Sequence, residues 1–312
     1  MAIKYKEFKF FSDSDKLEID CMAVAPDGEI KGVLQIVHGM CEHKERYYDF
    51  MKYIAEKGFL CVIHDNRGHG KSVHSDADLG YFYDGGYTAL VEDIHKLTEI
   101  VKEHVGEVPY YLMGHSMGSM AVRCYLKKYD ADIDGLVVVG SPSKPSATEL
   151  GLNVAKMISR IKGGHAHSWI LDNMVVNFAF ERRYKSERLL HSWICSDKKV
   201  VAAYNRDRYC NFNFTINGYI NLIELTREAY DKKGWKMNNP GIPIIFLSGK
   251  DDPCNISPSH FGKSVHFLKE VGYENVEARL YGNMRHEILN EKRKKRVYRD
   301  IYDFISGNLK SV

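Results

Sequence analysis

The sequence has no run of about eighteen apolar residues, the length that a helix needs to span a membrane. We therefore expect no transmembrane segment. Its first fifteen residues, MAIKYKEFKFFSDSD, contain neither an apolar core nor a small-residue cleavage site, so we also expect no secretory signal. The seven cysteines, an odd number, form no Cys-Xaa-Xaa-Cys pair and show no metal-ligand spacing. These absences predict reduced thiols in a cytoplasmic protein and give no indication of a cysteine metal site.

An excess of charge of one sign is also missing. The 44 basic and 41 acidic residues leave a net charge of +3, and no basic face alternates with aromatic side chains, so we expect no nucleic-acid partner. Internal repeats and low-complexity tracts are absent as well. Hydrophobic residues make up 44% of the chain, which is enough for a sizeable core. A length of 312 residues suits one large α/β domain or two ordinary ones.

What the sequence does contain is a regular exchange of strand-like and helix-like segments. Two β-like runs, 5–11 and 17–24, come first, and short apolar runs then alternate with amphipathic stretches. This rhythm predicts an α/β fold with a mostly parallel central sheet and helices on both faces. The further predicted strands are 32–39, 59–65, 109–114, 135–140, 242–249 and 276–282, and the predicted helices are 46–58, 87–105, 117–128, 261–272 and the C-terminal segment.

The exchange stops between residues 142 and 240, where helical and irregular, aromatic-rich segments contain no clear strand. We therefore expect a core domain of residues 1–141 and 241–312, interrupted by a mainly helical cap of residues 142–240. The cap begins after the C-terminal end of a strand, the edge at which open α/β sheets build their sites. Within it, an apolar face over 169–180 either packs the cap onto the core or lines a tunnel for an acyl chain. That face consists of Trp169, Ile170, Met174, Val175, Phe178 and Ala179.

The stretch MGHSMGS, residues 113–119, lies between a predicted strand and a predicted helix. A serine at such a tight turn, here Ser116, is raised above the sheet edge as a nucleophile, and Gly114 and Gly118 keep the turn free of colliding side chains. The N-terminus of the following helix adds a positive dipole end where an oxyanion would form. The alternative is a plain strand-to-helix turn with a capping serine.

A nucleophilic serine needs a base and a carboxylate that orients the base, and in this fold the chain order is serine, acid, histidine. The strand over 242–249 runs into KDDP, which offers Asp251 and Asp252. Pro253 keeps Asp252 out of the helical region, so Asp252 is the better candidate. The strand over 276–282 runs into NMRHEILNE, which supplies His286 as the base.

An oxyanion hole needs one N–H just after the nucleophile and one from the loop after an early strand. Met117 and Met40 supply them, Met40 in the motif HGM at 38–40. The glycine-rich stretch HDNRGHGKS at 64–72 lacks the spacing of a phosphate-binding loop and is expected to brace this segment. His115 is expected to point away from Ser116 and to serve in packing.

Taken together, these motifs resemble the serine hydrolases of the α/β-hydrolase fold that include monoacylglycerol lipases and bacterial lysophospholipases, the serine aminopeptidase S33-like group. Glu42 and Arg46 match family positions in the loop after the oxyanion turn. The chain departs from the family at Ser119, where a glycine is usual, and at Met40, where a smaller residue is usual. The motifs that carry the resemblance are HGMCEHKERY, DNRGHGKS, GHSMGS, SGKDDP and MRHEILNE.

The resemblance implies hydrolysis of a carboxylic ester through an acyl-enzyme, on monoacylglycerols or lysophospholipids and without a cofactor. It also implies a triad of Ser116, Asp252 and His286, with Met40 and Met117 as the oxyanion donors. The expected partner is a small lipid-like ester, with transient contact between the cap and a membrane surface; the sequence predicts no oligomeric state. The alternatives are a short-chain carboxylesterase, another chemistry on this fold such as cofactor-free haloperoxidation, and a non-catalytic binding protein.

Overall fold

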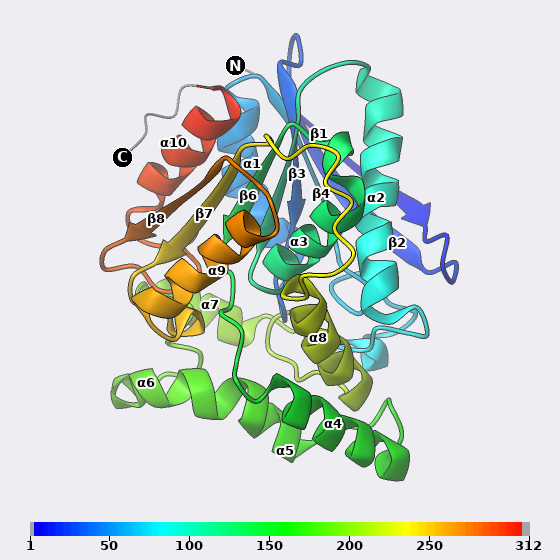
Figure 1. The fold of residues 1–312 in the computed structure, drawn as a ribbon, viewed down its shortest axis with the longest axis vertical. Helices are drawn as coiled ribbons and strands as arrows, with labels where there is room; N and C mark the ends of the chain where they lie inside the picture. Colours follow the sequence, from blue (N-terminus) through cyan, green and yellow to red (C-terminus); the bar gives the residue numbers. More distant parts are fainter. Residues whose placement is uncertain (1–2, 308–312) are drawn as a thin grey trace.

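The computed structural model describes residues 3–307, without the side chains of residues 176–179. An eight-stranded sheet with the order β1-β2-β4-β3-β5-β6-β7-β8 forms its centre (Figure 1). β1 (Ile3–Phe11) and β2 (Glu18–Pro26) are antiparallel to each other, β2 is antiparallel to β4 (Phe59–His64), and all later pairs are parallel. The other strands are β3 (Gly32–Val37), β5 (Tyr110–His115), β6 (Gly135–Val139), β7 (Ile244–Gly249) and β8 (Val276–Tyr281).

Helices cover both faces of the sheet, as the sequence predicts. The central strands are buried on both sides, and their sequences are therefore nearly continuous apolar runs. Successive side chains of β6 pack into two different cores, one on each face of the sheet. Leu136 and Val138 belong to the first core, and Val137 and Val139 belong to the second. The first core is closed by α2 (Gly86–Val105), α3 (Met117–Tyr129) and α9 (Pro258–Glu270), and the second by α1 (Tyr48–Ala55) and α10 (Lys294–Ile305).

The parallel register brings the C-terminal ends of the strands to one edge of the sheet. Val37 at the end of β3 pairs with Gly114 of β5, and His115 pairs with Val139 at the end of β6. Gly249 at the end of β7 pairs with Tyr281 at the end of β8. The loops that carry the predicted site residues therefore leave the sheet at neighbouring points.

Between β6 and β7 the described residues are helical and irregular and include no strand. Figure 1 shows α4, α5 and α6 as a layer at one end of the sheet, while α8 lies closer to the sheet. α8 contributes apolar side chains to the first core, against α2 and α3. The helices of this region are α4 (Thr148–Lys162), α5 (Trp169–Asp172), α6 (Arg182–Tyr184), α7 (Lys198–Arg206) and α8 (Ile216–Ala229).

The predicted apolar helix over 169–180 differs from the structure. α5 is a single turn, and η4 (Asn173–Glu181) continues it as a π-helix. The wider π-helical turn breaks the spacing that would place these side chains on one face. Trp169 and Ile170 are largely exposed, and the side chains of Phe178 and Ala179 lie outside the described residues.

All seven cysteines are free and buried in the structure. Among residues 3–307, no helix combines the length and the apolar character that a membrane span requires.

Candidate active site

Ser116 lies at the turn between β5 and α3 in a strained backbone conformation. Its φ of 53° and ψ of −117° fall where residues other than glycine are rarely found. The conformation is held on both sides, because Ser116 N donates to Val139 O of β6 at 2.9 Å and Ser119 Oγ donates to Ser116 O at 2.5 Å. This is the local geometry that a strand–nucleophile–helix elbow requires.

The two glycines of the elbow are needed for close backbone approach. A Cβ on Gly114 would lie 2.3 Å from Gly118 O, inside the same turn. A Cβ on Gly118 would lie 2.2 Å from Val37 O and 2.5 Å from His38 O. The start of α3 therefore packs directly on the end of β3, which no larger residue at these positions would permit.

The structure brings Asp252 and His286 together at the ends of β7 and β8. His286 Nδ1 lies 2.9 Å from Asp252 Oδ2, and both side chains are buried. The Asp252 carboxylate also accepts from Ser248 Oγ at 3.1 Å and from Cys254 N at 2.8 Å. Burial by itself would raise the pKa of Asp252, but the charge of His286 and its hydrogen bond hold the pKa below its usual value. This aspartate is therefore a carboxylate that can orient an imidazole.

Asp251 is placed differently. Its backbone N donates to Met284 O at 3.0 Å, and its carbonyl oxygen accepts from Tyr184 Oη at 2.5 Å. Among the described residues its carboxylate makes no hydrogen bond with His286. Of the two aspartates that the sequence offers, the geometry favours Asp252.

Ser116 and His286 line the same cavity. Among the described residues, Ser116 Oγ makes no hydrogen bond with His286. Such a bond is often long or absent in a serine hydrolase without substrate and forms only in the complex. The His286 ring is held from two sides, with its centroid 4.8 Å from that of His115 and 5.0 Å from that of Trp193.

The loop after β3 packs against Ser116. A Cβ on Gly39 would lie 3.0 Å from Ser116 Cβ, so the backbone beside Met40 runs next to the serine. Met40 and Met117 both line the cavity that contains Ser116. The stretch over 64–72 braces this loop as predicted, because Asn66 N donates to His38 Nε2 at 2.8 Å and Asn66 Nδ2 donates to His38 O at 2.9 Å.

The cavity above Ser116 has a volume of about 600 Å³. Polar and apolar side chains both line it, the common make-up of a site for an amphipathic small molecule. The polar side chains include Glu42, Arg183, His191, Tyr204 and Glu287, and the apolar side chains include Met120, Leu150, Met174, Val175, Leu222 and Ile223. Most of these apolar side chains come from the segment between β6 and β7.

Comparison with known proteins decides the family. Residues 28–293 match the family model described as serine aminopeptidase, S33. The chain belongs to this family. It is 24% identical to a monoacylglycerol lipase of Mycolicibacterium smegmatis, over 91% of both chains. It is 32% identical to a monoglyceride lipase homolog of Monkeypox virus, over 90% of this chain and 91% of that one.

The solved structures agree with the S33 assignment. A thermostable carboxyl esterase from Bacillus coagulans, solved in complex with glycerol, superposes with a TM-score of 0.88 and 28% identity. The match covers 97% of this chain and 98% of that one. This S33 family member therefore has the α/β-hydrolase fold, and it is a hydrolase.

Sequence reasoning missed a buried ionic network behind the site. Glu42 accepts hydrogen bonds from Gly39 N, from His115 Nδ1 at 2.9 Å and from Arg46 Nη1 at 3.0 Å. Arg46 also forms a bidentate pair with Glu287, at 2.8 and 2.7 Å, beside the proposed base. The network joins the loop after β3 to the loop after β8.

His115 corrects one expectation, because it does more than pack. Although burial alone would lower the pKa of His115, the charge and hydrogen bond of Glu42 raise it. The same pairing holds the pKa of Glu42 well below its usual range, against the opposing effect of burial. The motif HGMCEH contains the acid, but nothing in the sequence indicates its distant partners.

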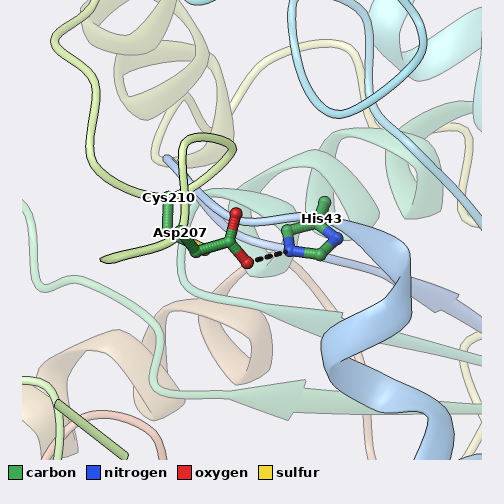
Figure 2. A group of neighbouring side chains, drawn as sticks. All are labelled: His43, Asp207 and Cys210. Carbon is green, nitrogen blue, oxygen red and sulfur yellow. Dashed lines mark hydrogen bonds and ion pairs between the residues drawn. The ribbon is translucent and has the colours of Figure 1, made fainter. Parts of the chain in front are cut away.

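Within the part of the chain that the structure describes, two groups of side chains have donors that could hold a metal ion, each with its ligand atoms within 4.8 Å of one another. One is Asp252, Cys254 and His286, where Asp252 already bonds the imidazole. The other is His43, Asp207 and Cys210, on the loop after β3 and on the segment before α8 (Figure 2). His43 uses both ring nitrogens there, Nδ1 with Glu45 and Nε2 with Asp207, so neither is left for a metal.

Proposed function

We propose that the protein hydrolyses carboxylic esters of lipid-like substrates through an acyl-enzyme on Ser116. The observation that carries the proposal is the strained Ser116 in one cavity with His286, whose Nδ1 is bonded to the buried Asp252. The names of the similar proteins, lipases and an esterase, support the same substrate class.

In this mechanism Ser116 Oγ attacks the ester carbonyl while His286 Nε2 takes the hydroxyl proton. Asp252 holds Nδ1–H of the ring toward itself and stabilises the imidazolium that forms. The backbone N–H groups of Met40 and Met117 receive the oxyanion. His286 then protonates the leaving alcohol. In the second half of the reaction a water molecule gives a proton to His286 and attacks the acyl-enzyme, and His286 returns the proton to Ser116 Oγ as the acid leaves.

The substrate we propose is a monoacylglycerol or a lysophospholipid. Its acyl chain would occupy the apolar wall formed by α4, η4 and α8, and its head group would face the polar wall. Residues 142–240 would then act as a cap over a core of residues 1–141 and 241–312. A short-chain carboxylesterase is the alternative, and chain-length preference separates the two.

We expect kcat/KM to rise steeply from acetyl to medium-chain p-nitrophenyl esters, measured below their critical micelle concentrations. Each buried CH₂ contributes about 0.8 kcal/mol, so four more enclosed carbons should raise kcat/KM by about a hundredfold. A flat or falling profile would contradict the lipid-like assignment and favour the short-chain carboxylesterase. No turnover of any ester would favour a non-catalytic binding protein.

A matched pair of helical glycines locates the acyl wall. A Cβ on the buried Gly151 of α4 would meet Met174 Cε at 3.5 Å and Ile223 Cδ1 at 3.9 Å, so Gly151→Leu fits only by filling the cavity. It should flatten the chain-length profile and leave acetyl-ester turnover within about threefold, since the lost gain is that of enclosed CH₂ groups. Gly262→Leu, in α9 with nothing within 4 Å of its Cβ position, is the control that should change neither.

We also propose that the outer face of the cap makes transient contact with an anionic membrane surface. Met157 and Ile161 of α4 are 57% and 80% exposed, and Trp169, the first residue of α5, is 77% exposed. Lys156 and Arg160 lie on the same helix as the first two. Exposed apolar side chains flanked by cations are typical of a helix that lies in the membrane interface.

Substituting both Ile161 and Trp169 by glutamate should therefore lower binding to phosphatidylglycerol-containing vesicles at least about tenfold in a sedimentation assay. The burial of two large apolar side chains and the attraction to anionic lipid are both lost. Turnover of a soluble ester should stay unchanged, since neither side chain lines the cavity. Equal vesicle binding by the variant and the unmodified protein would contradict this contact.

A further inference from the structure

Residues 207–213, in the segment between α7 and α8, lie against the loop that carries Met40. Two links join them. His43 Nε2 lies 2.9 Å from Asp207 Oδ2 (Figure 2), and Cys41 Sγ donates to Phe212 O at 3.2 Å. The loop and the segment are far apart in the sequence, with a separation of 164 positions between His43 and Asp207. A part of the proposed cap therefore touches the loop that would supply an oxyanion donor.

Asp207 is itself fixed by a tight turn. Its Oδ1 accepts from Tyr209 N at 2.9 Å, and its carbonyl oxygen accepts from Cys210 N at 3.0 Å and Asn211 N at 2.9 Å. One carboxylate oxygen, Oδ1, therefore stabilises the turn, and the other, Oδ2, contacts His43. On the other side of the ring, Nδ1 of His43 is bonded to Glu45.

We propose that Asp207 is a positioning residue that acts through His43 to hold the loop bearing the Met40 N–H in its oxyanion-binding place. This inference rests on the proposed ester hydrolysis and assigns Asp207 a role in its transition state. The side chain of Asp207 touches neither the serine nor the cavity, since it is absent from the cavity wall.

The loop needs such support because its backbone is strained directly beside Met40. Cys41, directly after Met40, has a φ of 52°, a conformation that a residue other than glycine keeps only when its surroundings enforce it. Glu42 anchors the loop from within, through Gly39 N. Asp207 and Phe212 anchor it from the cap side, through His43 and through Cys41 itself.

The protonation state of His43 decides whether its ring can donate both hydrogen bonds, one to Glu45 and one to Asp207. Two carboxylates accept from the ring, so His43 must carry protons on both nitrogens. Burial alone would lower the pKa of His43, but the hydrogen bonds to Glu45 and Asp207 raise it above its usual value of 6.5. The charged and titratable groups around the ring are Lys44, Glu45, Arg46, Asp207, Tyr209 and Cys210.

The test is the Asp207→Asn variant, assayed with p-nitrophenyl esters from acetyl to octanoyl. Loss of an oxyanion donor costs about a hundredfold or more, so a misplaced donor should lower kcat about tenfold. The loss should be the same for every acyl length with KM nearly unchanged, and affinity for a trifluoromethyl ketone analogue should fall by the same factor. Arg208→Gln, one residue along and paired with the exposed Asp76, is the matched control that should lose nothing.

A pH profile and a double substitution separate positioning from a general loss of structure. In the unmodified protein kcat should fall as the pH rises through the raised pKa of His43, because neutral imidazole can donate only once. Asp207→Asn should lack this alkaline step. His43→Gln should cause the same loss as Asp207→Asn, and the double variant should add no further loss.

The inference is overturned if Asp207→Asn keeps full kcat, loses activity only with long acyl chains, or retains the alkaline step. If Asp207→Asn lowers the melting temperature, the double variant with His43→Gln decides the question. Losses of kcat that add up in the double variant also overturn the inference. Labelling of Ser116 by a fluorophosphonate distinguishes this failure from failure of the proposed function. A labelled, active enzyme that is indifferent to Asp207→Asn contradicts only the positioning role, whereas an unlabelled protein contradicts the hydrolase mechanism.

Discussion

The Ser116→Ala variant should lose ester hydrolysis by about 10⁵- to 10⁶-fold, because it lacks the hydroxyl on which the proposed acyl-enzyme forms. The fold should survive the change. Ser116 is held through its backbone N and O, and alanine keeps both of these hydrogen bonds. We therefore expect an unchanged melting temperature together with a nearly complete loss of kcat.

The assay is initial-rate hydrolysis of a p-nitrophenyl ester, with the melting temperature measured on the same samples. Substrate should still bind, since the change removes only one hydroxyl from the cavity wall, and a non-hydrolysable monoacylglycerol ether analogue can report that binding. A variant that keeps near-normal turnover with an unchanged melting temperature would remove Ser116 from the mechanism.

Asp252→Asn should lower kcat by about 10⁴-fold, the loss expected when the orienting carboxylate of such a triad becomes an amide. The amide would present the wrong partner to His286 Nδ1, which now lies 2.9 Å from Asp252 Oδ2. Asp251→Asn is the matched control one residue away. Its carboxylate makes no described contact with the base, so we expect a loss below about threefold, the ordinary effect of a surface change.

The same pair of variants has a signature in stability against pH. The pKa of Asp252 is held below its usual value of 3.8, so its pairing stabilises the fold above that value. This contribution is lost as the pH falls from 3.8 through the lowered pKa. The Asp252→Asn variant should lack that acid-dependent step, while the Asp251→Asn variant should keep it. A larger loss of turnover for Asp251→Asn than for Asp252→Asn would reverse the assignment of the acid.

Much of the fold could be predicted because the sheet is mostly parallel and covered on both faces. Strands such as β6 and β7 are fully buried and therefore appear as nearly continuous apolar runs between amphipathic helices. The site residues could be proposed because each predicted residue follows a strand that ends at the same edge. The glycines of the elbow add to this. A Cβ at Gly114 or Gly118 would lie only 2.2 to 2.3 Å from a backbone oxygen, so the sequence has to keep glycine at both positions.

The rest depends on contacts that no local pattern encodes. His115 meets Glu42 across 73 positions, and Arg46 meets Glu287 across 241, so their pairing is a consequence of the whole fold. The π-helical turn of η4 also escaped prediction, because the apolar residues over 169–180 are spaced as in an ordinary α-helix. Trp193, which packs on His286, comes from an irregular segment with no periodic signal.

Reaction with a fluorophosphonate probe, followed by mass spectrometry of the digested protein, tests the central claim most directly. The account predicts one probe per chain on the peptide that contains Ser116, and loss of ester hydrolysis in proportion to labelling. A monoacylglycerol present during the reaction should slow the labelling. Labelling at another residue, or complete labelling of Ser116 with ester hydrolysis intact, would contradict it.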